Sequence, residues 1–173
     1  MNNKINKLMT MKYTGGFECD KAAKNILKDL IENVWFSSCT IVFDEENEMN
    51  EYATMDMLFT AYTTTGHHYA YAIELKERKG YNHSDFTEWM IETHKLNDMK
   101  RYRQFGYKCF YFNLFKDGIY YLWNYDTIAE NHKEALIPIK PHTQGEDTEE
   151  KVKQTRIMID AKDIVLSGTT NQI

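Results

Sequence analysis

Cysteine and long apolar runs are both scarce in this sequence of 173 residues. The three cysteines, Cys19, Cys39 and Cys109, are odd in number, and no two of them are spaced like metal ligands. This pattern is typical of free thiols in a reduced compartment, so we expect a cytoplasmic protein. No stretch approaches the roughly 18 apolar residues of a membrane span. Residues 1–7 also lack the apolar core of a signal peptide, so we expect no membrane partner.

The composition has neither the polarity of a disordered chain nor an excess of basic residues. Apolar residues make up 42% of the sequence and aromatic residues 14%, which is enough for one folded core. The length fits a single domain over residues 1–173. The formal net charge is -5, which is unusual for a protein that binds phosphates over its whole surface. The distribution of charge therefore matters more than its sum.

Periodicity and turn residues predict a fold in which helices and strands alternate. We predict helices at 20–33, 85–105 and 127–136, and strands at 39–43, 52–63, 67–77, 107–115, 119–125 and 154–159. Residues 64–66 would form the turn of a long hairpin. This order of elements indicates an α/β fold with a central mixed β-sheet flanked by helices.

The second strand of the predicted hairpin places two charged residues on the same face. Alternate side chains of a strand share a face. Tyr71, Ile73 and Leu75 would point to the core, whereas Glu74 and Lys76 would point the other way. A Glu-x-Lys pair is common on surface strands, but this strand is otherwise uncharged before Lys76. Glu74 and Lys76 are therefore candidates for a functional role, and not only for a solvated surface position.

The register of the hairpin decides whether a second acid joins this pair. A three-residue turn centred at Thr65 sets Asp56 directly opposite Glu74. Opposite side chains on two strands have Cβ atoms roughly 4.5–5.5 Å apart. A two-residue turn would shift the register and break the alignment, unless a bulge restored it. The position of Asp56 is thus the conditional part of the prediction.

Two carboxylates this close repel each other, so one binds a proton or a cation lies between them. Asp56, Glu74 and the backbone carbonyl of Leu75 would offer the oxygen ligands that Mg²⁺ or Mn²⁺ prefers. Such an ion lowers the pKa of bound water and stabilises a pentavalent phosphate. Lys76 would position the attacking water or offset developing negative charge. These residue types together indicate hydrolysis of a phosphodiester.

Asp56 and the later Glu74-Leu75-Lys76, followed by a helix and another strand, resemble the motifs of the PD-(D/E)XK nuclease superfamily. The motifs are short and degenerate, and Met55 stands where other members have proline. The resemblance implies a restriction-endonuclease-like core over about residues 18–125 and a C-terminal extension over residues 126–173.

The resemblance also implies contributions from two helices. Members of the superfamily often supply a further acidic metal ligand from the first helix, and Glu18 or Asp20 could match it. Asp20 is equally suited to cap that helix. Members also place a catalytic Gln or Lys on the later helix, where Lys95 fits best. Lys95 could instead be an ordinary solvated residue that pairs with Glu92.

The implied function is that of a Mg²⁺-dependent deoxyribonuclease that cuts DNA internally. A compact chain without an evident specificity domain is similar to structure-selective members such as Holliday-junction resolvases, which cut branched DNA as homodimers. A small restriction or phage-type nuclease is the alternative. Between residues 76 and 108 there are eight Lys or Arg and five Asp or Glu, so this segment is locally basic. The residues expected to contact nucleic acid are Arg78, Lys79, Lys100, Arg101 and Arg103.

Two interpretations without catalysis remain. The chain could be a nucleic-acid-binding or protein-interaction module that keeps the nuclease fold. It could also be an unrelated α/β protein in which the three motif residues have no common role. The distance between the carboxylates of Asp56 and Glu74 separates this last interpretation from the others.

Overall fold

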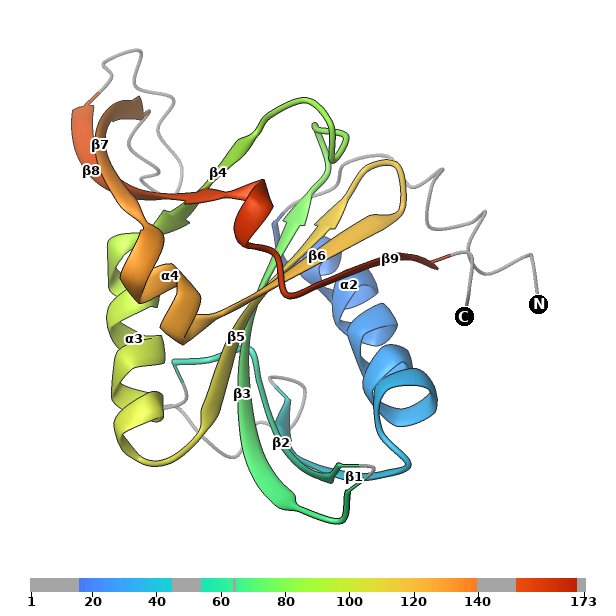
Figure 1. Cartoon of the computed structure of the whole chain (residues 1–173). Helices are drawn as coiled ribbons and strands as arrows, with labels where there is room; N and C mark the ends of the chain where they lie inside the picture. The colour runs from blue at the N-terminus through green and yellow to red at the C-terminus, as the bar shows by residue number, and fades with distance from the viewer. Residues whose placement is uncertain (1–15, 45–53, 64, 140–151, 171–173) are drawn as a thin grey trace.

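The computed structural model describes residues 16–44, 54–63, 65–139 and 152–170 of the chain, which form helices around a central sheet (Figure 1). The helices are α2 (Gly16–Leu30), which continues as a π-helical turn (Ile31–Trp35), α3 (Thr93–Gln104), α4 (Tyr125–Asn131) and a 3-10 turn (Ala161–Asp163). The strands are β1 (Ser38–Asp44), β2 (Met57–Tyr62), β3 (His68–Arg78), β4 (Glu88–Glu92), β5 (Lys108–Phe115), β6 (Ile119–Asn124), β7 (Lys133–Ile139), β8 (Val152–Asp160) and β9 (Leu166–Thr169). Within these described ranges, no helix combines the length and the apolar character needed to cross a membrane.

The central sheet has six strands in the order β1-β2-β3-β5-β6-β9. β3 and β5 run parallel, and all the other neighbours are antiparallel. Parallel neighbours need a long crossover, and here β4 and α3 lie between β3 and β5 in the chain. The predicted fold class, a central mixed sheet flanked by helices, is confirmed.

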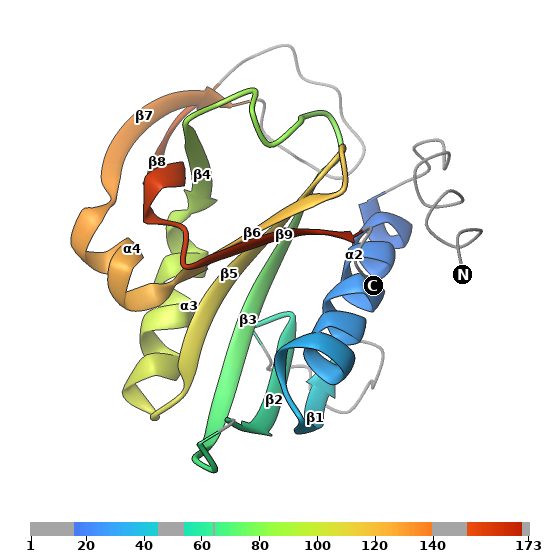
Figure 2. The same cartoon turned by 45° about the vertical axis from the view of Figure 1, so that its right-hand side comes forward.

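One face of the central sheet is covered by α2, as Figure 2 shows. Its buried residues Ala23, Leu27 and Leu30 recur every three or four positions and so form one side of the helix. They belong to an apolar cluster that includes Tyr71 and Ile73 of β3. The odd-numbered residues of β3 therefore face α2, as strand alternation predicts.

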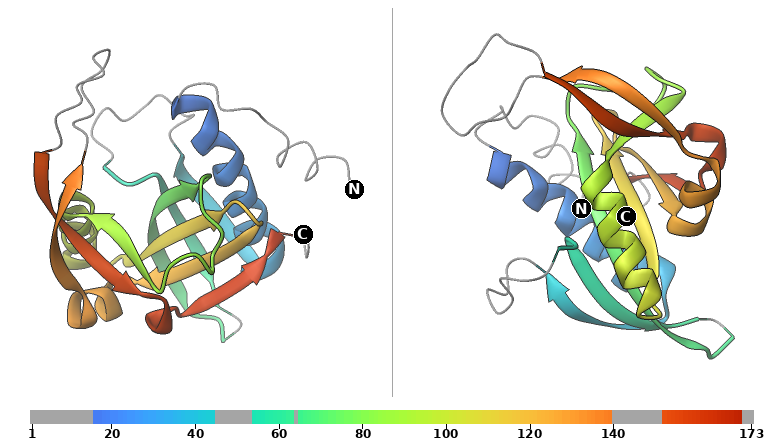
Figure 3. Two further views of the ribbon diagram at one scale, coloured as in Figure 1. Left: turned by 90° about the horizontal axis from the view of Figure 1, so that it is seen from above. Right: turned by 90° about the vertical axis from the view of Figure 1, so that its left-hand side faces the viewer.

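The opposite face is covered by α3, α4 and a second antiparallel sheet with the order β4-β8-β7 (Figure 3). Ala72 of β3 lies under this layer in a cluster with Met99 of α3, Trp123 of β6 and Ile128 of α4. Both faces of β3 are thus buried. As a consequence, Glu74 lies in the interior of the protein, where a charge is more costly than on a surface strand.

The register of the β2–β3 hairpin agrees with a turn centred at Thr65. Met57 pairs with Ile73, and the pairing continues without a shift to Tyr62 and His68. Gly66 completes the turn with a φ of +80°, a left-handed conformation that favours glycine. Continuing this register by one residue beyond Met57 sets Asp56 against Glu74, and no bulge is needed.

The helix predicted over residues 85–105 is wrong in its first part, because residues 88–92 form β4. Trp89 and Ile91 are buried, while the residues beside them are partly exposed, which is the two-residue period of a strand. β4 pairs along its whole length with β8, more than 60 residues later in the chain. Only this distant partner makes a strand of a segment that continues directly into a helix.

Residues after 126 contribute strands to both sheets. The helix predicted over 127–136 is wrong in its second part, since α4 ends at Asn131 and β7 follows. Ile137 and Ile139 favour a strand, and Pro138 disfavours a helix interior. β8 confirms the strand predicted over 154–159. β9 was not predicted, and it pairs with β6 at the edge of the central sheet; the division into a core and a C-terminal extension stays a prediction.

Candidate active site

Asp56 and Glu74 come together at the end of the β2–β3 hairpin that lies away from its turn. Asp56 immediately precedes β2, which begins later than the predicted 52–63, and Glu74 lies within β3. Oδ2 of Asp56 accepts a hydrogen bond of 2.7 Å from the backbone N–H of Leu75. This bond fixes the carboxylate of Asp56 beside the residue that follows Glu74. The hairpin therefore brings the two acids into the proximity that the predicted register requires.

The carboxylate of Glu74 is buried and only partly satisfied. Its side chain is 5% exposed, and Oε1 lies 2.7 Å from Nζ of Lys95. Lys95 reaches it from the N-terminal end of α3, which packs over this face of the sheet. Oε2 is buried and makes no hydrogen bond to any residue that the structure describes. A buried carboxylate oxygen without a partner is costly unless it binds a cation or a proton.

The charges of this cluster are strongly coupled. Burial, and after it the negative charge of Asp56, raise the pKa of Glu74 to about 8 against the opposing effect of Lys95. Burial lowers the pKa of Lys95, but the charge and hydrogen bond of Glu74, together with the charges of Asp56 and Glu92, outweigh it, so that the pKa is raised overall. Lys95 therefore stays protonated while Glu74 exchanges its proton near neutral pH. A shifted acid in a cleft is typical of functional sites.

Asp56 and Glu74 open into a cleft of about 260 Å³. It is lined by Asp56, Glu74, Leu75, Lys76, Arg78, Met90, Ile91, Glu92, Lys95 and Tyr111. Lys76 is exposed, and it forms no ion pair with any of the described residues. The cleft therefore unites the four predicted catalytic residues, although their roles stay predictions.

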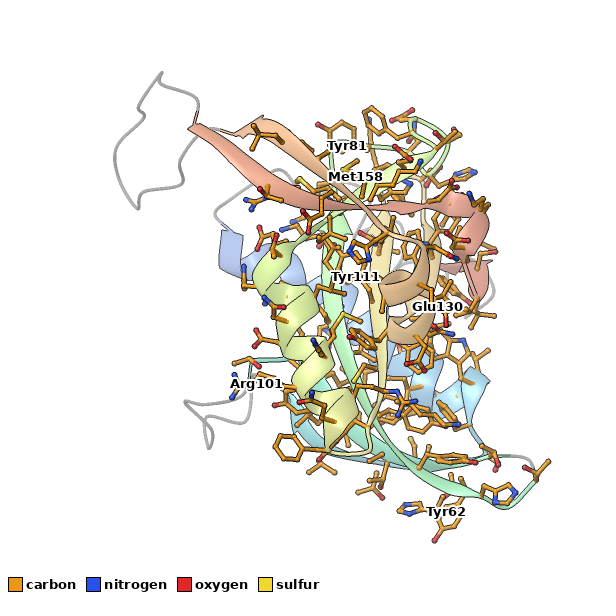
Figure 4. The ribbon with its side chains drawn as sticks, turned by 60° about the vertical axis from the view of Figure 1, so that its left-hand side comes forward. Tyr62, Tyr81, Arg101, Tyr111, Glu130 and Met158 are labelled. Carbon is orange, nitrogen blue, oxygen red and sulfur yellow. The ribbon has the colours of Figure 1, made fainter. Side chains whose placement is uncertain are left out.

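One wall of the cleft was missed from the sequence because it belongs to β4. β4 supplies Met90, Ile91 and Glu92; its burial alternates, but Trp89, Met90 and Ile91 are all apolar, so the sequence carries no polar–apolar alternation that could have revealed the strand. β5 supplies Tyr111, which Figure 4 shows in the interior beside α3. Burial raises the pKa of Tyr111 to about 12, so its phenol stays neutral. This phenol donates a hydrogen bond of 3.4 Å to the carbonyl of Met90.

Arg78, which was predicted to contact nucleic acid, is engaged inside the protein. Its Nε donates to Oδ1 of Asn113 at 2.8 Å, and its Nη2 donates to the hydroxyl of Tyr111 at 3.1 Å. Nη2 also donates to the carbonyl of Met90, and the guanidinium lies over the ring of Trp89. Arg78 thus joins β3 to β5 and β4 and fixes the wall of the cleft.

The other residues predicted to bind nucleic acid do not line the cleft. These residues are Lys79, Lys100, Arg101 and Arg103. Three of them have an acidic neighbour at 3.0–3.7 Å, and Lys100 is exposed. Figure 4 shows Arg101 on the outer side of α3. Ion pairs with an exposed cation, such as those of Arg101 and Arg103, are weak, so a phosphate can compete for these two cations.

Two carboxylates define the donor set for a metal among the described residues. The predicted third ligand, Glu18 or Asp20, lies on α2, but both side chains are outside the part of the chain that the structure describes. Within that part, no group of three or more His, Cys, Asp or Glu side chains could hold a metal ion. Mg²⁺ often binds through one or two carboxylates and keeps several waters. Asp56 and the unpartnered Oε2 of Glu74 fit such a hydrated ion.

Comparison with known proteins adds a similarity of shape. No protein-family model matches the chain, and no curated protein is significantly similar to it. Among solved structures, the chain is similar to Hjc, a Holliday junction resolvase from the archaeal hyperthermophile Archaeoglobus fulgidus. The TM-score is 0.44 at 14% sequence identity, over 86% of this chain and 97% of that chain. The chemistry of the cleft, rather than this likeness, therefore carries the functional assignment.

Proposed function

We propose that this chain is a metal-dependent nuclease that hydrolyses phosphodiester bonds in DNA. The observation that carries the proposal is the pairing of Asp56 with Glu74 in a charged cleft, where one buried oxygen of Glu74 has no partner among the described residues. Because Asp56 and Glu74 pair in this way, we prefer a shared role for the motif residues to an accidental arrangement. Paired carboxylates beside lysines are suited to hold a divalent cation and a phosphate together.

Each residue of the cleft has a distinct role in this proposal. Asp56, Glu74 and the backbone carbonyl of Leu75 would hold Mg²⁺ or Mn²⁺. When bound, the ion supplies an activated water and stabilises charge on the phosphate. Lys76, exposed in the cleft, orients that water or offsets the charge that develops on the phosphate oxygens. Lys95 brings a second positive charge to the same place.

For the substrate, we propose DNA that is recognised by its shape. The sequence resemblance favours branched DNA cut by a homodimer, and a small restriction or phage-type nuclease acting on linear duplex is the alternative. The exposed cations on α3, Lys100 and Arg101, support contacts to phosphates that carry no sequence information. Rates on a four-way junction and on a linear duplex of the same sequence distinguish the two possibilities.

A cleavage assay tests the activity itself. The purified full chain is incubated with Mg²⁺ or Mn²⁺ and with linear, supercoiled, single-stranded and four-way-junction DNA. We expect cleavage of at least one substrate, and we expect none with a chelator. Asp56→Asn should abolish cleavage. The control is Glu88→Gln, which should cut like the parent chain, because Glu88 pairs with Lys133 outside the cleft. Cleavage that is insensitive to Asp56→Asn removes Asp56 from the mechanism.

A module that binds nucleic acid without cutting it is the second candidate. The observation that favours it is the Lys95 ammonium group, which already lies 2.7 Å from the Glu74 carboxylate without any metal. Such a module needs no divalent cation, so calorimetry with Mn²⁺ separates the candidates. Binding of DNA together with a complete absence of Mn²⁺ binding would favour the module over the nuclease.

A further inference from the structure

Lys76 and Lys95 both line the cleft, but they are engaged in different ways. Nζ of Lys95 lies 2.7 Å from Oε1 of Glu74, and its side chain is only 28% exposed. Lys76 extends from β3 into an exposed position and has no ion-pair partner within the described residues. Lys95 is therefore held at the carboxylate that the proposed function assigns to the metal, whereas Lys76 is not.

With Glu74 ionised, the charges that line the cleft balance without any bound cation. Three acids, Asp56, Glu74 and Glu92, face three bases, Lys76, Arg78 and Lys95. Within this balance, the Lys95 ammonium occupies one oxygen of Glu74 and leaves the other without a hydrogen bond to the described residues. A divalent ion on Glu74 would lie a few ångströms from this ammonium, and like charges at that distance repel strongly in a partly buried site.

We propose that Lys95 is the counter-ion of the metal-free site and that a divalent cation and the Lys95 ammonium compete for Glu74. This inference rests on the proposed function, because it takes Glu74 to be a metal ligand. Binding of the cation displaces Lys95 from Oε1 of Glu74. The released ammonium then faces the cleft, where it can bind a phosphate oxygen.

Competition of this kind couples substrate binding to metal binding. Before the metal binds, the ammonium of Lys95 is held by Glu74 and is not available to a phosphate. Afterwards, the cleft has gained the charge of the metal and a lysine without its former partner. A phosphodiester is therefore bound in the cleft chiefly when the metal needed to cut it is present, which prevents unproductive occupation of the site.

The simpler interpretation is a permanent ion pair that fastens α3 to β3. In that case a metal would bind through Asp56 and Oε2 of Glu74 alone, and Lys95 would keep its bond to Oε1. The two interpretations differ in what the removal of the Lys95 charge does to metal affinity. If Lys95 competes with the metal, its charge raises the dissociation constant of the metal. If Lys95 forms a permanent ion pair that orders Glu74, it lowers this dissociation constant.

Calorimetric titration of the full chain with Mn²⁺ makes this distinction. Relative to the parent chain, Lys95→Met should bind Mn²⁺ about tenfold more tightly, because a nearby positive charge is gone. Lys76→Met is the matched control: it removes a lysine from the same cleft, but from a solvent-screened position, and should change the affinity by less than about threefold. Lys95→Arg keeps the charge and should bind like the parent chain. Equal or weaker binding by Lys95→Met overturns the inference.

A second measurement does not depend on the folding of any variant. The ζ-ammonium signal of Lys95 in the parent chain is followed by NMR during titration with Mg²⁺. We expect this signal to move with the metal occupancy while the signals of exposed lysines stay in place; a stationary signal at saturation overturns the inference but leaves the nuclease intact. If neither the parent chain nor any variant binds Mn²⁺ or Mg²⁺, the proposed function fails, and the inference fails with it.

Discussion

Oδ2 of Asp56 accepts a hydrogen bond from the backbone N–H of Leu75, and this bond joins the start of β2 to the residue after Glu74. The bond gives Asp56 two separable functions. It satisfies a backbone donor next to the cleft, and it holds a negative charge against Glu74. An amide in place of the carboxylate keeps the first function and loses the second, whereas alanine loses both.

Asp56→Asn and Asp56→Ala should therefore differ in stability but not in activity. Both should lose Mn²⁺ binding and at least about 100-fold in cleavage rate, since loss of a residue that only orients a metal ligand already reaches that magnitude. Asp56→Ala should also lose about 1–3 kcal/mol in free energy of unfolding, because the N–H of Leu75 is left unpaired. Asp56→Asn should have a free energy of unfolding equal to or above that of the parent chain. Its side-chain carbonyl still accepts the hydrogen bond from Leu75, and the repulsion between the carboxylates at positions 56 and 74 is gone. Urea unfolding checks the difference, and equal losses in both variants would contradict it.

The raised pKa of Glu74 predicts how the stability of the metal-free chain depends on pH. The unfolded chain releases this proton near the ordinary value of 4.5, whereas the folded chain retains it up to about 8. Between these values the native state binds more protons than the unfolded state, so the free energy of unfolding falls as pH rises. The loss attributable to Glu74 should be on the order of 5 kcal/mol.

Glu74→Gln is the control for this pH dependence, because it has the same shape and cannot titrate. The difference in free energy of unfolding between the parent chain and Glu74→Gln should change steadily from pH 4.5 to 8, and it should level off on either side. Saturating Mn²⁺ should oppose the fall in the parent chain, since the ion stabilises the ionised carboxylate. Parallel pH profiles for the two proteins would show that Glu74 titrates normally.

The site was predictable from the sequence as far as local rules reach. Strand alternation places Glu74 and Lys76 on one face, and a turn centred at Thr65 sets Asp56 against Glu74; the observed pairing has this register. These relationships lie within one hairpin, so they follow from neighbouring residues. Lys95 was found only through the resemblance to a nuclease superfamily, because its contact with Glu74 depends on how α3 packs over the sheet.

The parts that could not be predicted depend on contacts between distant segments. Arg78 looked like a surface cation, but pairing of β3 with β5 leaves it half-buried against Asn113 and Tyr111. β9 contains two small residues, Ser167 and Gly168, and no strong strand signal, and it is a strand because β6 offers a free edge. In both cases the partner lies more than 30 residues away, beyond the range of local periodicity.

Arg78 should behave as a structural residue rather than as a ligand for phosphate. Arg78→Met removes the donors to Asn113, Tyr111 and the carbonyl of Met90, and it should cost about 1–3 kcal/mol in free energy of unfolding. Lys79→Met is the neighbouring control and should cost less than about 0.5 kcal/mol. If Arg78 were only a phosphate ligand, Arg78→Met would leave the free energy of unfolding unchanged and would reduce the salt dependence of DNA binding. Urea unfolding together with binding at several salt concentrations measures both.

Two adjacent residues of β4 test the strand against the helix that local periodicity predicted. A helix over residues 85–105 would put Met90 in its apolar stripe and leave Ile91 outside it. In the strand, Ile91 is 1% exposed and belongs to the apolar cluster that contains Met99 and Ile157, whereas Met90 is only partly buried. Ile91→Ala should therefore cost about 2–5 kcal/mol in free energy of unfolding. Met90→Ala should cost clearly less, since less of its side chain leaves water on folding. A larger loss for Met90→Ala than for Ile91→Ala would mean that this wall of the cleft is helical.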